Sequence, residues 1–175
     1  QDLICWWNVT LTTVDLFAIK ERIVDILKSD TTNLWDSTPS DKTKFRKIEA
    51  GSPSPKAIQE PPLPRLWVTS DDVVANVSHV AVIENNVHLG EEYDIRIKIL
   101  FVVEAKDGQK TEEDIDDFTK SIIEKLETNY DLRDGAESTR LAESSQVTQI
   151  MDLPTMFRGD RVKGRVIKFK VIVRT

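Results

Sequence analysis

Apolar residues recur at helical spacing in two segments of the chain. Between residues 13 and 28 they fall three or four positions apart, at Leu16, Ile19, Ile23 and Ile26/Leu27. A second stripe follows the capping-box-like sequence Thr111-Glu112-Glu113-Asp114 and consists of Ile115, Phe118, Ile122 and Leu126. The pattern predicts two amphipathic helices, one over residues 13–28 with Thr12 or Thr13 as its cap and one over residues 111–129.

Alternation with a period of two marks the strands. The clearest strand is predicted over residues 93–103. Its two faces alternate, and towards its end both faces are apolar, because Leu100 and Val102 lie on the face opposite the inward one. Its inward face is Tyr93, Ile95, Ile97, Ile99, Phe101 and Val103. A last strand over residues 164–175 should face inward with Ile167, Phe169, Val171 and Val173. Shorter strands are predicted over residues 65–69, 79–83 and 147–153, with a polar turn at Asp71 and Asp72 between the first two.

Two polar stretches interrupt this pattern. Residues 29–64 form a polar excursion, and residues 130–147 read as a polar loop. Five prolines accumulate late in the excursion, at Pro53, Pro55, Pro61, Pro62 and Pro64. Because proline fixes φ and lacks an amide donor, residues 51–64 are predicted to be an extended arm or loop, neither helix nor central strand.

The order of the elements favours one α+β domain over residues 1–175. We expect a mainly antiparallel twisted sheet of about five strands, with two helices packed on one face and a long proline-rich arm. The net charge of -6 argues against sequence-independent binding to nucleic acid, and we expect no sequence-specific binding either. No apolar run approaches the length of a membrane span. Cys5, the single cysteine, excludes a disulfide within the chain and a thiolate metal cage.

A candidate for chemistry lies at the end of the long strand. The sequence Phe101-Val102-Val103-Glu104-Ala105-Lys106 resembles that of metal-dependent nucleases of the restriction-endonuclease-like superfamily. That resemblance implies a divalent cation held by Glu104 and an aspartate of the neighbouring strand, with Lys106 orienting water. No aspartate follows residues 79–83, and Asp94 lies roughly 30 Å from Glu104 along the same strand. The nuclease is therefore the alternative hypothesis.

Other candidate sites have plainer interpretations. His79 and His88 lack partner ligands and are expected at the surface, Cys5 lacks a base, and the acidic residues around Asp116-Asp117 suit a solvated helix face. We expect no metal, no cofactor and no catalysis. Two features instead suggest contacts with other proteins. The first is four tryptophans, at Trp6, Trp7, Trp35 and Trp67, which either lie at an interface or are covered by residues 29–64.

The second feature is a basic C-terminal stretch in an acidic chain. Its cations are Arg158, Arg161, Lys163, Arg165, Lys168, Lys170 and Arg174. A basic strand face could meet acidic helices of another copy head to tail, where complementary charge sets the register. Alternating Lys and Arg could equally well only protect an edge strand from aggregation.

Taken together, the segments Leu16–Leu27, Tyr93–Val103, Glu112–Leu126 and Arg165–Val173 resemble the tail-terminator and tail-completion (neck) proteins of tailed viruses. The match is architectural and covers roughly a third of the chain. It implies a virion protein, made in the host cytoplasm, that forms a homohexameric ring and binds the tail tube and connector proteins. The interface residues we expect are Pro53, Pro55, Pro61, Pro62, Trp67, Arg96, Lys98, Arg165, Lys168 and Lys170.

Overall fold

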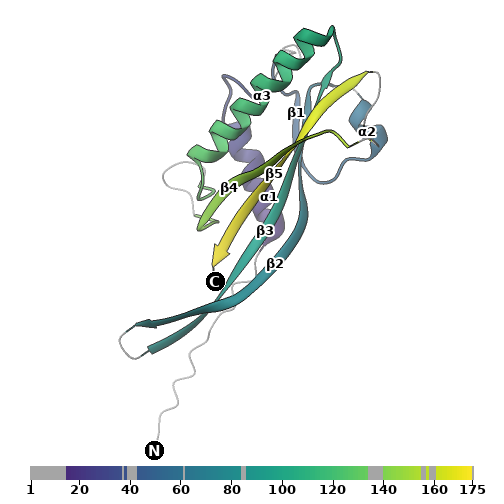
Figure 1. The fold of residues 1–175 in the computed structure, drawn as a ribbon. Helices are drawn as coiled ribbons and strands as arrows, with labels where there is room; N and C mark the ends of the chain where they lie inside the picture. The colour runs from purple at the N-terminus through teal and green to yellow at the C-terminus, as the bar shows by residue number, and fades with distance from the viewer. Residues whose placement is uncertain are drawn as a thin grey trace, which may run out of the picture.

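A five-stranded sheet organises the chain (Figure 1). The computed structural model describes residues 15–36, 38, 43–60, 62–83, 86–133, 140–154, 157 and 161–174, with side chains left out at 72 and 74–91. The elements in chain order are α1 (Leu16–Lys28), β1 (Lys47–Ala50), α2 (Pro55–Gln59), β2 (Arg65–Ile83), β3 (Asn86–Glu104), α3 (Gly108–Thr128), β4 (Ser144–Asp152) and β5 (Val162–Arg174). Across the sheet the strand order is β1-β2-β3-β5-β4, and every pair is antiparallel except β1 with β2. The predicted α+β class is confirmed.

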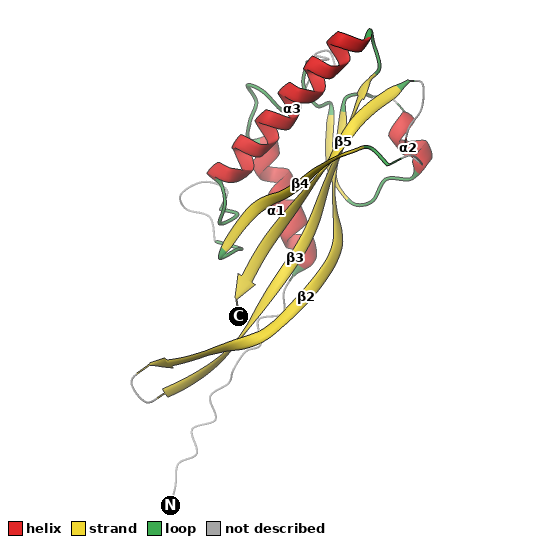
Figure 2. Cartoon of the chain, in the orientation of Figure 1, coloured by secondary structure: helices red, strands yellow, loops and turns green. Residues whose placement is uncertain are grey.

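Helices α1 and α3 pack on one face of this sheet (Figure 2). The inward stripe predicted for α3 is buried as expected, and on α1 Ile19, Ile23, Ile26 and Leu27 are buried. They meet the predicted inward face of β3 and of β5, so that these alternating positions form one continuous core. None of the helices in the described part of the chain is long and apolar enough to cross a membrane.

The helix caps differ from those predicted. Helix α1 begins one residue after Asp15, whose side chain accepts from the amide of Ala18; Thr12 and Thr13 lie outside the described residues. Helix α3 begins about one turn before Thr111, because Asp107 is its cap and accepts from the amide of Lys110 at 3.0 Å. An aspartate at this position satisfies a free amide of the first turn.

The proline-rich segment is not an extended arm over its described residues. Ser54 caps the short helix α2 by accepting from the amide of Ala57, and Pro55 takes the first helical position, where no amide donor is needed. Helix α2 buries Ile58 against a second apolar cluster, on the sheet face opposite α1 and α3. The other members of that cluster are Trp67, Leu100, Val102, Leu153, Val162 and Val166. The prediction of no helix in residues 51–64 was therefore wrong.

The polar excursion also contributes to the main core. Leu34, Phe45 and Ile48 are fully or almost fully buried, and β1 pairs with the start of β2. The ring of Phe45 lies 4.2 Å from that of Phe118 and 5.7 Å from that of Phe101, measured between centroids. These isolated apolar residues have no periodicity, which is why strand β1 was missed.

Strand β2 corrects a second prediction. Residues 65–69 and 79–83 belong to one strand of 19 residues, paired with β3 throughout. Irregularities between Ser70 and Val73, and between Asn76 and His79, shift the register without ending the pairing. Asp71 therefore sits in a bulge rather than in a turn, where its carboxylate pairs with Lys98 at 3.0 Å. Strand β4 likewise begins at Ser144, inside the stretch 130–147 predicted as loop.

Candidate interaction surfaces

The far ends of β2 and β3 form a two-stranded ribbon. Strand β1 pairs with β2 only over Arg65–Val68, and β5 pairs with β3 only from Glu92 to Glu104. Residues 76–83 and 86–91, which we call the ribbon, are thus paired only with each other among the described strands, apart from Asn76, which pairs with Glu92 at the base. Figure 1 shows the ribbon extending well past the end of β5. The backbone of His79 and His88 lies in it.

An ion pair and an exposed apolar side chain lie at the base of the ribbon. Arg174 Nε donates to Glu92 Oε2 at 2.9 Å, and this hydrogen bond raises the pKa of the guanidinium above its ordinary value. Nearby, Val73 is 41% exposed, although its partner Ile95 on β3 is buried. An apolar side chain therefore reaches solvent where the ribbon leaves the sheet.

Strand β4 forms one edge of the sheet. It pairs with β5 on one side, and no other described strand pairs with it on the other. Ile150 and Met151, which follow one another in this strand, are 46% and 38% exposed. Consecutive strand residues point to opposite faces, so the sheet covers neither face of β4 at these two positions. Sequence reasoning missed both residues, because consecutive apolar residues in a strand are also what burial on two faces produces, as at Ile99 and Leu100.

The predicted basic residues divide between the two faces of the sheet. In the register of β3 with β5, Arg96 lies opposite Lys170 and Lys98 lies opposite Lys168. These four residues, which we call the basic quartet, occupy the face opposite α1 and α3. Arg165 lies on the helix side, where its Nη1 donates to Asp116 Oδ1 at 2.6 Å and to Thr119 Oγ1 at 3.3 Å. It ties β5 to α3 within the chain.

Trp67 is not available to a partner in this structure. Its ring is 2% exposed beneath α2, its indole Nε1 donates to Glu49 Oε1 at 2.8 Å, and the guanidinium of Arg65 lies 4.8 Å from the ring centroid. The excursion thus covers this tryptophan, and Trp67 is removed from the expected interface. Trp35 is partly buried against the core, with Lys28 Nζ 5.0 Å from its ring centroid. Trp6, Trp7 and Cys5 lie outside the described residues.

The prolines expected at the interface differ in their exposure to solvent. Pro55 is exposed at the start of α2, whereas Pro53 and Pro62 are half-buried. Pro61 lies outside the described residues. Among the described prolines of the expected interface, Pro55 is therefore the one in the exposed class.

The carboxylate of Glu49 holds the buried cation of this region. It accepts from Arg65 Nη2 at 3.0 Å and pairs with Lys47 Nζ at 3.1 Å, in addition to the bond from Trp67. Burial by itself raises the pKa of Glu49, but the hydrogen bonds from Lys47, Arg65 and Trp67 outweigh it, so the pKa is lowered overall. Glu49 therefore belongs to a structural ion pair, and its carboxyl does not donate a proton near neutral pH.

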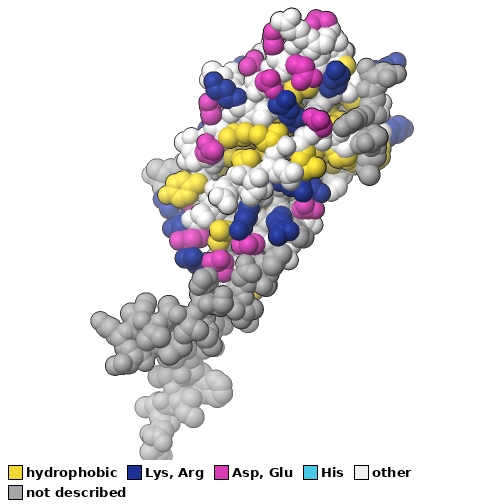
Figure 3. Space-filling model, in the orientation of Figure 1, with side chains coloured by type: hydrophobic (Ala, Val, Ile, Leu, Met, Phe, Trp, Pro, Cys, Tyr) yellow, Lys and Arg dark blue, Asp and Glu magenta, His cyan; other side chains and the backbone are white. Residues whose placement is uncertain are grey.

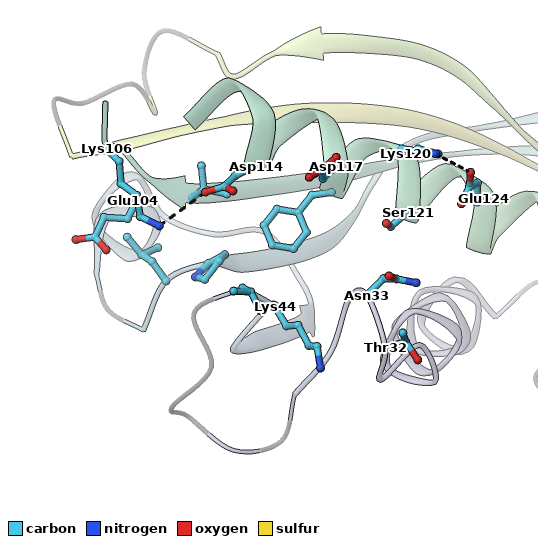
Figure 4. Close-up of a pocket in the computed structure, with 15 residues that line it drawn as sticks. Thr32, Asn33, Lys44, Glu104, Lys106, Asp114, Asp117, Lys120, Ser121 and Glu124 are labelled. Atoms are coloured by element: carbon cyan, nitrogen blue, oxygen red, sulfur yellow. Dashed lines mark ion pairs between the residues drawn. The ribbon is translucent and has the colours of Figure 1, made fainter. Parts of the chain in front are cut away.

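Glu104 and Lys106 line a polar groove of about 520 Å³ between the end of β3, α3 and the loop after α1 (Figure 4). Lys106 Nζ lies 3.8 Å from Asp114 Oδ2, and Asp117 lines the same groove. Figure 4 shows Glu104 turning its carboxylate away from Asp114. Within the described part of the chain, no three His, Cys, Asp or Glu side chains are placed to hold a metal ion.

The groove thus brings Lys106 to an acidic residue that the sequence did not single out for this role. Lys106 pairs with Asp114, yet the carboxylates of Glu104 and Asp114 point apart and do not converge on one point as in a nuclease-type metal site (Figure 4).

No protein-family model matches the sequence, and a comparison with curated protein sequences finds no significant match.

Proposed function

We propose that the chain is a structural subunit of a homo-oligomeric ring in a tailed virion, of the tail-terminator or head–tail joining kind. The observation that carries this proposal is the ribbon, a two-stranded extension with no other described strand to pair with. In this proposal the chain functions through the surfaces that bind other subunits, and it catalyses no reaction.

The ribbon supports assembly for an energetic reason. A two-stranded hairpin alone in water is marginally stable, and an unpaired strand edge is a template for pairing with another chain. The sequence of this ribbon is rich in apolar residues, namely Val77, Val80, Val82, Ile83, Val87 and Leu89. Docking against a neighbouring subunit would pair an open strand edge, and a hexameric ring would give every copy the same contact.

The rest of the surface favours the same function. The edge strand β4 exposes Ile150 and Met151, and α1 exposes Phe17 at 59% of its surface. Large exposed apolar residues next to an open sheet edge are typical of protein interfaces. The architecture, with a helix before a long hairpin, a second helix across the sheet and closing strands, agrees with the tail-completion resemblance. The further partners we propose are the tail-tube and connector proteins.

Shortening the ribbon tests the proposal directly. In one variant an Asn-Gly turn replaces residues 77–91, so that the paired residues Asn76 and Glu92 flank a two-residue hairpin turn. We expect the native chain to form an oligomer at micromolar concentration, measured by size-exclusion chromatography with light scattering. The shortened variant should keep its circular dichroism spectrum and elute as a monomer. A native chain that stays at its 20.0 kDa monomer mass, with no assembly on added tail-tube protein, contradicts the proposal.

A second candidate function rests on the polar groove. Glu104, Lys106 and Asp114 line it together, which is the reason to keep the divalent-metal-dependent nuclease as the alternative. Its test is plasmid nicking with magnesium or manganese by the native chain and by Glu104→Ala. Cleavage that requires the metal and is lost in the variant would replace the assembly proposal with a hydrolytic one.

A further inference from the structure

The basic quartet places like charges directly opposite each other across two strands. Arg96 faces Lys170, and Lys98 faces Lys168, in adjacent rows of the β3–β5 ladder. Like charges in directly opposed positions destabilise a sheet. The residues between them, such as Ile97 and Phe169, are buried on the helix side, so the quartet points to the other face. Because these opposed cations reduce the stability of the sheet, their positive charge suggests a function other than folding.

Carboxylates of the same chain neutralise part of the quartet. Lys98 Nζ pairs with Asp71 at 3.0 Å and Lys170 Nζ pairs with Asp94 at 3.1 Å. Among the described residues, the ion pairs of the quartet leave Lys168 without a partner. A hollow of about 300 Å³ lies at the quartet, lined by Asp71, Arg96, Lys168 and Lys170 among others. Within the described part of the chain, Lys168 therefore keeps an uncompensated positive charge beside a depression that can receive side chains.

Helix α3 carries the complementary charge on its outer side. Its exposed acids outnumber its lysines, and Figure 3 shows Asp and Glu side chains gathered over the helix. The exposed acids are Glu112, Glu113, Asp116, Asp117, Glu124 and Glu127. Glu112, Asp117 and Glu127 have no ion-pair partner among the described residues, and Glu124 pairs only weakly with Lys120, at 3.9 Å between two exposed groups.

The two charged surfaces lie on opposite sides of the same sheet. Helix α3 covers one face, whereas the quartet lies on the other (Figure 2). A single chain cannot bring its own acidic helix to its own quartet, but a second copy can. Such a contact is heterologous: each copy offers one surface to each of two neighbours, and the contact closes into a ring when the rotation allows.

We infer that the basic quartet of one copy binds the acidic outer face of α3 of the next copy. The inference rests on the proposed ring function and adds the surfaces and the direction of assembly. Duplex DNA is the competing polyanion, but Asp71 and Asp94 within the patch disfavour phosphates. Charge complementarity of this kind sets partner and register, and it weakens as salt screens it.

Complementary charge reversal tests this contact. The first variant, Arg96→Glu with Lys168→Glu, makes the quartet acidic. The second, Asp117→Lys with Glu124→Lys and Glu127→Lys, leaves three exposed acids on α3 and makes the helix face basic. Each variant alone should lose the oligomer, because both of its surfaces then carry the same sign. An equimolar mixture should regain the oligomer, since every contact between the two variants joins opposite charges. The readout is mass by light scattering, with circular dichroism to show that both variants fold.

A control carries the same change in net charge at another place. Lys56→Glu with Lys163→Glu reverses two exposed lysines outside the quartet and should leave the oligomer unchanged. A native oligomer that neither variant disrupts overturns this inference and leaves the ring proposal standing, whereas a native monomer overturns both. Binding of duplex DNA that is lost in Arg96→Glu/Lys168→Glu, with the oligomer intact, would assign the quartet to nucleic acid and overturn the inference.

Discussion

Trp67 Nε1 donates a hydrogen bond to Glu49 Oε1 at 2.8 Å, across the parallel pair that β1 makes with β2. The register places these two residues directly opposite each other. Glu49 also holds the guanidinium of Arg65, which is 7% exposed. One carboxylate thus accepts from a buried indole and from a buried cation at the same time, so the tryptophan belongs to the folded interior of the chain and not to its outer surface.

Glu49→Gln should destabilise the protein at pH 7 by on the order of 1 to 3 kcal/mol, because Arg65 loses its charged partner. The folded-state pKa of Glu49 is lowered, so its contribution is present above the unfolded-state pKa and disappears as the pH falls through the folded-state value. Urea unfolding should therefore show that the difference in free energy of unfolding between the native protein and Glu49→Gln becomes smaller as the pH is lowered from 7. Glu112→Gln, at an exposed helix position, is the control. A difference that stays constant at acidic pH would count against this account.

Gly164→Ala should destabilise the protein strongly. A Cβ at Gly164 would collide with the carbonyl oxygen and carbon of Phe101 and with Cα of Val102, all of them backbone atoms of β3 that cannot turn aside. We expect a loss of at least about 2 kcal/mol, at the level of overpacked cores, measured by urea unfolding.

Gly108→Ala is the matched control, because no atom lies within 4 Å of the Cβ it would add and the position is helical. Its stability should be unchanged or slightly raised, since alanine favours helix over glycine. Equal effects of the two substitutions would show that the close approach of β5 to β3 is not what requires glycine.

Phe45→Ala should cost about 3 to 5 kcal/mol, as for other fully buried aromatic residues. Phe45 comes from the polar excursion and packs edge-to-face against Phe101 and at a tilt against Phe118, so its loss should also loosen the excursion from the sheet. Thermal unfolding measures the first effect, and faster amide exchange in β1 measures the second. Phe17→Ala, at an exposed position of α1, should change stability by less than ~0.5 kcal/mol.

Asp107→Ala should destabilise α3 by about 1 kcal/mol through loss of the cap on the amide of Lys110. Asp107→Ser should restore most of this loss, because serine also caps the N-terminus of a helix. Chemical unfolding of the three proteins measures both effects. If serine and alanine destabilise equally, the cap is not the source of the loss.

Periodicity alone determined much of this architecture. The stripes of α1 and α3 and the alternating faces of β3 and β5 appear in the order of apolar residues, since burial of one helix or strand face demands that spacing. The α+β class followed from the order of those elements. The four cations of the quartet could be named for the same reason, because alternate positions of one strand share a face.

Contacts between distant segments were decided only by the tertiary structure. Phe45, Ile48 and Ile58 are single apolar residues in polar surroundings, and only the packed sheet shows that they are buried. The sequence likewise carries no mark that β2 continues through Asp71, because a bulge preserves pairing where local composition indicates a turn. The bond from Arg165 to Asp116 joins β5 to α3 across 49 positions of the chain, a long-range contact that no local pattern encodes.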